Sequence, residues 1–147
     1  MGSYSMTARD AFGQAANLMS RRWRGRLDER LKDTGLSQAR WLALFELSSS
    51  DEGLMQRDLA DRLGIEAPTI VRPLDDLERR GLIARREAPN DRRAKRVTLT
   101  AAAAPVLDQI TSIAATLRDE LLADISDSDL ATSLSVLRRV NQRLEQK

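Results

Sequence analysis

The stretch that decides the fold runs from Leu59 to Thr100 and reads LADRLGIEAPTIVRPLDDLERRGLIARREAPNDRRAKRVTLT. It contains a short helical segment that ends at Gly64, a second helical segment that starts near Pro68, and two extended segments on either side of a turn. A helix, a tight turn, a second helix and a basic hairpin in this order predict a winged helix-turn-helix. In that arrangement the second helix enters the major groove of DNA, and the hairpin reaches the backbone or the minor groove.

The hydrophobic pattern gives each helix of this stretch a buried face. The inward positions, at helical spacing from about residue 56 onward, are Leu59, Ala60, Leu63, Ile70, Leu74 and Leu77. The second helix keeps Thr69, Val71, Arg72, Asp75 and Asp76 on its other faces. Pro73 removes a hydrogen bond inside that helix, which predicts a kink or a loosened turn. After Gly81, residues 82–86 and 96–100 predict the two strands of the wing, with 88–91 as its turn.

Amphipathic helices are predicted on both sides of this stretch. They span about residues 8–32 and 37–47 before it, and about 101–121 and 126–144 after it. Gly35 is expected to end the first of them, and Ser37, Thr100 and Ser126 to cap the other three. Together with the wing, these segments predict a mainly α protein with a small β-hairpin (α+β).

The first helix and the last two carry apolar stripes that lie outside the DNA-binding stretch. We therefore predict a winged helix-turn-helix domain over residues 36–100 and a helical dimerisation region made of residues 1–34 and 101–147. A symmetric homodimer would place its two recognition helices about 34 Å apart, which is one turn of DNA, so the natural target is a palindromic site. The alternative is that the stripes form an intramolecular bundle.

Charge is concentrated in the wing. The chain as a whole carries +2, whereas residues 79–96 hold eight basic and two acidic residues, a net +6. A basic stripe on a mildly acidic body is typical of a protein that binds a polyanion, because each neutralised phosphate releases counterions.

Several classes of protein are disfavoured. The chain has no cysteine and no histidine, which excludes disulfides, thiolate chemistry, Cys/His zinc sites and imidazole catalysis. No phosphate-binding glycine loop or serine elbow is present, so we expect no enzyme, no cofactor and no metal. Without an apolar run of spanning length or a signal peptide, we expect a cytoplasmic protein with no membrane contact. Residues 1–5 look like a cloning remnant or a disordered lead.

At the level of family, the sequence resembles the MarR family of bacterial transcription regulators, and within it the SlyA-type branch. The similarity is strongest in DRRAKRVTLT, residues 91–100, and in GIEAPTIVRPLDDLE, residues 64–78. It is looser around Trp23-Arg24 and Trp41. The resemblance implies an interlocked dimer in the bacterial cytoplasm, associated with the nucleoid.

The resemblance also implies roles for individual residues. Pro68 and Thr69 would lie at the groove-facing start of the recognition helix, and Arg72 would contact base edges or the backbone in the major groove. Arg92 would enter the minor groove from the wing tip, while Arg93 would pair with Asp91 and hold the wing in shape. The DNA-binding set that we predict is Pro68, Thr69, Arg72, Arg92, Arg93, Lys95 and Arg96.

Many members of the family bind small aromatic carboxylates in a crevice beside the winged domain. The matching positions here are Arg21, Trp23, Arg24, Trp41, Phe45, Arg72 and Pro73. An aromatic wall with guanidinium groups suits a flat anion, although Trp23, Trp41 and Phe45 at helical spacing also fit a core. An anion near Arg24 and Arg72 would compete with phosphate. We therefore predict a repressor or anti-silencer that an aromatic carboxylate releases from DNA; a ligand-independent architectural DNA-binding protein and a helical adaptor are the alternatives.

Overall fold

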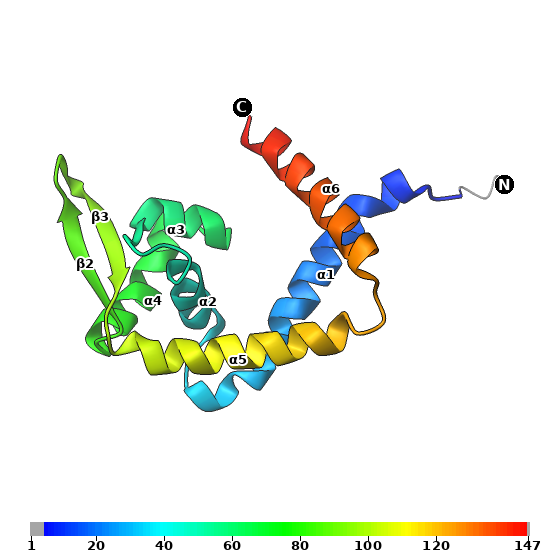
Figure 1. Cartoon of the computed structure of the whole chain (residues 1–147). Coiled ribbons are helices and arrows are strands. Elements are labelled where there is room, and N and C mark those ends of the chain that lie inside the picture. The colour runs from blue at the N-terminus through cyan, green and yellow to red at the C-terminus, as the bar shows by residue number, and fades with distance from the viewer. Residues whose placement is uncertain (1–4, 147) are drawn as a thin grey trace. The chain divides into compact units, whose positions relative to one another are not determined.

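The structure is a computed structural model that describes residues 5–146, so the expected cloning remnant lies outside the described residues except for Ser5. The chain divides into two compact units, one reaching as far as Ala114 and the other beginning at Ala115. In the first unit, the helices α2, α3 and α4 gather beside a β-hairpin (Figure 1). Each unit is described below by itself.

The first unit begins with helix α1, Ala8–Arg30, which is stabilised by a capping box that the sequence analysis missed. The Asp10 N–H donates to Thr7 Oγ1 at 3.2 Å, and the Thr7 N–H donates to the Asp10 carboxylate at 2.9 Å. The hydrogen bond from the Thr7 hydroxyl lowers the pKa of the Asp10 carboxyl. The helix ends earlier than expected, because a 3₁₀ turn, η1 (Lys32–Thr34), intervenes before Gly35, which takes the predicted left-handed conformation with φ 72°.

Helix α2, Gln38–Leu47, supplies the centre of the core with Trp41, Leu44 and Leu47, all at most 1% exposed. The prediction that Ser37 caps this helix is wrong in one respect. Ser37 occupies the N-cap position, but no hydrogen bond joins its side chain to the helix backbone. Its hydroxyl instead accepts a hydrogen bond from Arg40 Nη1 at 2.6 Å, because the charged guanidinium is the stronger donor.

Helices α3, Gln56–Leu63, and α4, Ala67–Arg79, form the expected pair. The tight turn between them is built on Gly64, which has φ 66°, a conformation that glycine adopts without a steric penalty. All six predicted inward residues are buried: Leu59, Ala60, Leu63, Ile70, Leu74 and Leu77. Helix α4 continues through Pro73 to Arg79, so the proline does not end it; a kink at this position stays a prediction.

The sheet has three strands rather than the two predicted for the wing. They are β1 (Leu54–Met55), β2 (Ile83–Ala88) and β3 (Asp91–Leu99), in the antiparallel order β1-β3-β2. The expected strand bounds were too short, since the pairing of β2 with β3 reaches Ala88 and Asp91 and leaves a turn of two residues. Gly53 precedes β1 with φ 77°, and a Cβ there would overlap the carbonyl oxygen of Val97. Only glycine therefore allows β1 to approach β3.

Helix α5 spans Ala103–Leu121, and helix α6 spans Asp127–Glu145. The Thr100 cap was predicted incorrectly, because its hydroxyl donates to the Gly81 carbonyl at 2.5 Å and the helix starts three residues later. The Ser126 cap is confirmed by the hydrogen bond from the Asp129 N–H to its hydroxyl at 3.1 Å. No described residue of α6 is buried. Within the described residues, no helix has the length and apolar character needed to cross a membrane.

Candidate nucleic-acid interface

Helix α4 has one buried face and one open face. Ile70, Leu74 and Leu77 are fully buried on the first. The predicted DNA-contacting residues Pro68, Thr69 and Arg72 are all exposed. Pro68 sits in the first turn of the helix, where its missing N–H removes no intrahelical bond. The N-terminal half of α4 therefore presents to solvent a mixed surface with one hydroxyl, from Thr69, and one guanidinium, from Arg72.

The C-terminal half of α4 carries acids, and each has an arginine partner. Asp76 accepts a hydrogen bond from Arg40 Nε of α2 at 2.6 Å. It also forms ion pairs with Arg80 at 2.9 Å and Arg79 at 3.2 Å. The Arg40 hydrogen bond, followed by the charges of Arg40, Arg80 and Arg79, holds the pKa of the Asp76 carboxyl below its ordinary value. This carboxylate joins α2 to α4.

A second set of contacts joins α4 to the wing. The guanidinium of Arg85, in β2, contacts Asp75 and lies 3.2 Å from Glu78, and the Arg85 backbone N–H donates to Glu78 at 3.0 Å. Asp75 and Glu78 are one turn apart on α4, so one fork-shaped side chain reaches both. The Arg85 hydrogen bond lowers the pKa of Glu78, and the Glu78 carboxylate raises the pKa of Arg85. Arg85 was counted toward the basic stripe of the sequence, and its role as a link between α4 and the wing was not predicted.

The basic residues of β3 have different surroundings from one another. Arg92 and Arg93 are exposed near the tip of the hairpin. Lys95 lies opposite Glu87 on β2, with its Nζ 3.6 Å from the carboxylate. Arg96 is half-buried, and its Nη1 lies 3.4 Å from the carbonyl oxygens of Glu52 and Gly53. Arg96 thus fastens the loop before β1 to the sheet, a contact that the sequence analysis did not predict.

Asp91 does contact Arg93, although not by the expected charge pair. The carboxylate accepts a hydrogen bond from the Arg93 backbone N–H at 2.9 Å. An Asp side chain that binds the N–H two residues onward fixes a turn locally. The wing tip is therefore held by the backbone amide, and the Arg93 side chain is left for other contacts.

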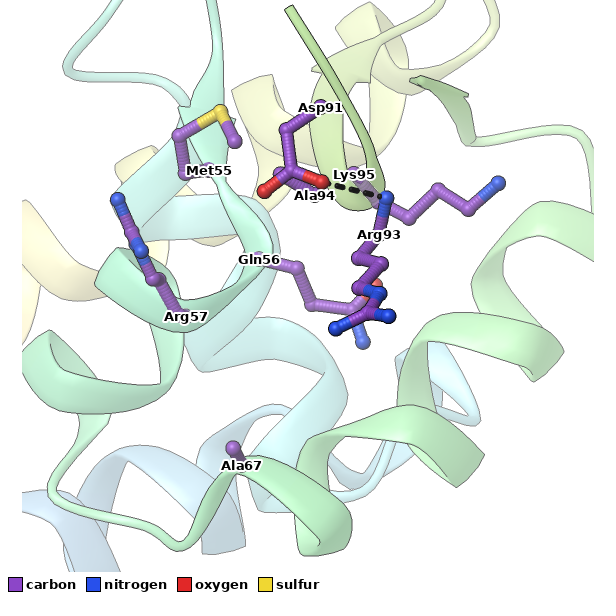
Figure 2. A pocket seen from close by; sticks show the side chains of 8 residues that line it. All are labelled: Met55, Gln56, Arg57, Ala67, Asp91, Arg93, Ala94 and Lys95. Carbon is purple, nitrogen blue, oxygen red and sulfur yellow. Dashed lines mark hydrogen bonds between the residues drawn. The ribbon is translucent and has the colours of Figure 1, made fainter. Parts of the chain in front are cut away.

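A groove lies between α3, the start of α4 and β3. It has a volume of about 290 Å³. Its lining residues are Met55, Gln56, Arg57, Ala67, Asp91, Arg93, Ala94 and Lys95 (Figure 2). Three cationic side chains and one carboxylate border it, so it favours an anionic group. Gln56 and Arg57 were not among the predicted site residues; their place in the first turn of a helix facing the wing was the available signal.

The predicted effector residues do not line this groove. Trp41 is 1% exposed, and its indole N–H donates to Asp28 at 3.0 Å, so it belongs to the core that joins α1 to α2. Phe45 is exposed, and so are Arg21, Arg24 and Arg72. Trp23 and Pro73 are half-buried. Of the three aromatic residues, only Trp41 takes the core position that was the alternative.

Comparison with known proteins places these features in a family. Residues 34–94 match the sequence profile of the MarR family. The crystal structure of the transcriptional regulator PA3341 is 43% identical, with a TM-score of 0.85, over 92% of this chain and 99% of that chain. A MarR family regulator from Silicibacter pomeroyi shows the same fold, with a TM-score of 0.86 and 24% identity over 100% of this chain and 99% of that chain.

CouR from Rhodococcus jostii RHA1, solved with bound p-coumaroyl-CoA, is 25% identical with a TM-score of 0.78, over 92% of this chain and 95% of that chain. The similarity thus extends well beyond the winged domain. The helix-turn-helix, the three-stranded sheet and the exposed arginines agree with it. The chain belongs to the MarR family of transcriptional regulators, which bind DNA and are not enzymes.

Proposed function

We propose that this protein is a homodimeric repressor or anti-silencer of the SlyA type, which binds a palindromic site in double-stranded DNA. The observation that carries the proposal is the placement of cations on one unit. No hydrogen bond or ion pair within residues 5–146 occupies the guanidinium groups of Arg72 on α4 or of Arg86 and Arg92 on the wing. Arg72 would contact bases or phosphates in the major groove, beside Pro68 and Thr69. Arg92 would enter the minor groove.

Exposed apolar side chains support the homodimer. In α6, Leu134, Val140 and Leu144 are 47%, 37% and 76% exposed, and they follow the predicted stripe. Phe12 and Met19 of α1 are also exposed. Apolar surface that is exposed in this way costs free energy in water, and packing against a second copy of the chain would bury it. Residues 1–34 and 101–147 would thus form the dimerisation region, and 36–100 the DNA-binding domain.

An effector is the second part of the proposal. CouR was solved with p-coumaroyl-CoA, which favours an aromatic acid or a derivative of one as the ligand class here. Exposed Arg21, Arg24 and Arg72 would receive the anion, with Phe45, Trp23 and Pro73 as apolar neighbours. Because phosphate and ligand would compete for Arg72, binding of one would weaken the other by about 1–3 kcal/mol.

Selection of bound sequences from random duplex DNA, with and without a panel of aromatic carboxylates and their CoA thioesters, tests the proposal. We expect an inverted repeat, and a loss of affinity with at least one compound. Enrichment of sequences without dyad symmetry would contradict the proposal that a homodimer binds a palindromic site. An inverted repeat whose affinity no compound changes would instead support the ligand-independent architectural protein.

A further inference from the structure

The groove between α3, α4 and β3 is lined by cationic side chains that suit an anion. Its position in the domain indicates which anion it would bind. It lies between the first residue of α4, Ala67, and the wing residues Arg93 and Lys95. If α4 occupies the major groove and the wing the adjacent minor groove, the DNA strand that separates the two grooves must pass between them. The backbone of that strand is where a phosphate would meet this groove.

We propose that the groove binds one DNA backbone phosphate, held by Arg57 of α3 and Arg93 of β3. This proposal rests on the proposed docking of α4 and the wing on DNA. It adds Arg57 to the predicted DNA-binding residues, and it gives a phosphate partner to Arg93, for which the resemblance implied both DNA binding and a structural role opposite Asp91.

The two arginines are available for this contact. The side chain of Arg57 is 79% exposed, and its ion pair with Asp58 is long, at 3.9 Å. The Asp91 carboxylate, which also borders the groove, receives the Arg93 backbone N–H, and no ion pair within the described residues ties up the Arg93 guanidinium. In Figure 2 the Arg93 side chain points toward Gln56, whereas the Lys95 ammonium extends away. Lys95 is already paired with Glu87.

Gln56 explains how Arg93 would be held in place. Its Oε1 is buried and lacks a hydrogen-bond partner among the described residues. A buried acceptor without a hydrogen-bond partner costs free energy. A guanidinium has five donors in a rigid fork, so Arg93 can donate to Gln56 Oε1 and to a phosphate at the same time. Binding of the phosphate would thereby satisfy an acceptor that the free protein leaves unpaired.

The backbone adds to the site. Gln56 and Ala67 are the first residues of α3 and α4, and neither helix has a side-chain cap on its first N–H groups. In α4, however, Pro68 has no N–H and the Thr69 N–H donates to the Glu66 carbonyl at 2.9 Å, so the contribution comes mainly from α3. Free N–H groups at a helix N-terminus favour an anion. They supplement the two guanidinium groups and do not replace them.

The test uses the full-length protein and a duplex recovered by the selection described above. Arg57→Ala and Arg93→Ala should each lower affinity roughly three- to tenfold at 0.1 M salt, and each should reduce the slope of log K against log salt by at most about 0.9, the value for the one phosphate that the two arginines share. Arg57→Lys should keep the slope. Arg62→Ala is the matched control, because Arg62 lies on the same helix but faces Glu46 and Ser49; it should bind as the wild type does.

Single methylphosphonate substitutions then locate the contact. Each removes the charge of one phosphate, and at one position per half-site the Arg57→Ala variant should lose less affinity than the wild type does, because only Arg93 still contacts that phosphate. Wild-type affinity and slope in Arg57→Ala, or equal losses for both proteins at every position, would overturn the site while leaving the proposed function intact. Failure of the wild type to bind any duplex would overturn both.

Discussion

The arginines of α2, α4 and the wing fall into two groups, which differ in whether an acidic side chain contacts the guanidinium. One group, the paired arginines, contacts acids of the C-terminal half of α4 and consists of Arg40, Arg79, Arg80 and Arg85. The other group, the open arginines, has no acid partner within the described residues and consists of Arg72, Arg86, Arg92 and Arg93. The same residue type thus has two uses in one domain, and the net charge of a segment does not distinguish them.

The difference explains how an acidic helix can approach DNA. Asp75, Asp76 and Glu78 would repel phosphates if they were left bare. The paired arginines neutralise them and, because they come from α2, from the end of α4 and from β2, they also hold α4 in position. The open arginines are then free to attract phosphate. Variants that remove a single side chain from one group or the other test this division.

Arg85→Gln should have the largest effect. It leaves Asp75 and Glu78 without their shared partner at a side chain that is 17% exposed, so the free energy of unfolding should fall by about 1–3 kcal/mol. DNA affinity should fall as well, because the wing is released from α4. Denaturant unfolding and DNA titration measure the two quantities.

Arg86→Gln is the control for this variant, since the neighbouring side chain is exposed and has no acid partner among the described residues. It should keep the stability of the wild type while weakening DNA binding. If the two variants lost equal stability, the division into paired and open arginines would be wrong at these positions.

Arg92→Ala should leave stability unchanged and weaken DNA binding by about 1–2 kcal/mol, with a preference for narrow minor grooves relaxed. The reason is that Arg92 is exposed near the wing tip, and its side chain makes no hydrogen bond or ion pair with the described residues. In an Arg85→Gln background the same substitution should matter less, because a loosened wing no longer places Arg92 on the DNA. Strictly additive losses in the double variant would argue against positioning by Arg85.

Much of this arrangement could be predicted from local pattern. Helical spacing identified Ile70, Leu74 and Leu77 as the buried face of α4, and the exposed positions Thr69 and Arg72 followed from it. The glycine between two helical patterns correctly predicted the turn at Gly64. These features depend on residues within one or two turns of each other, which is the range over which sequence periodicity carries information.

The contacts that define the paired arginines could not be predicted in this way. Arg40 and Asp76 are 36 residues apart, and Arg96 lies more than 40 residues from the carbonyls that it binds. Their pairing follows from how the hairpin and α2 pack on α4. The short strand β1 was missed for a related reason, since two residues are too few to show alternation.

Acid should weaken the ion pairs of the paired arginines, because protonation removes the charge of their carboxylate partners. The open arginines have no such partners to lose. The pKa of Asp76 is lower than its ordinary value of 3.8, so its contribution to stability is complete above about pH 4 to 5 and is lost as the pH falls through the lower value that it has in the folded protein. Asp76→Asn should therefore be less stable than the wild type at pH 7, and the gap should narrow below pH 4. Urea unfolding at both pH values measures it; a gap that widens in acid would reverse the assignment.

Lys95→Gln should have the smallest effect, because Lys95 falls between the two groups. Its ammonium is exposed and lies 3.6 Å from Glu87 across the strands, and an exposed pair of this kind contributes about 0–0.5 kcal/mol. Stability should be nearly unchanged, and DNA affinity should fall by roughly twofold, less than for Arg92→Ala, since Glu87 already offsets part of the charge. Glu87→Gln is the matched control and should raise affinity slightly by freeing Lys95. If Lys95→Gln instead cost as much as Arg92→Ala, the cross-strand partner would not restrain this lysine, and Lys95 would act together with the open arginines.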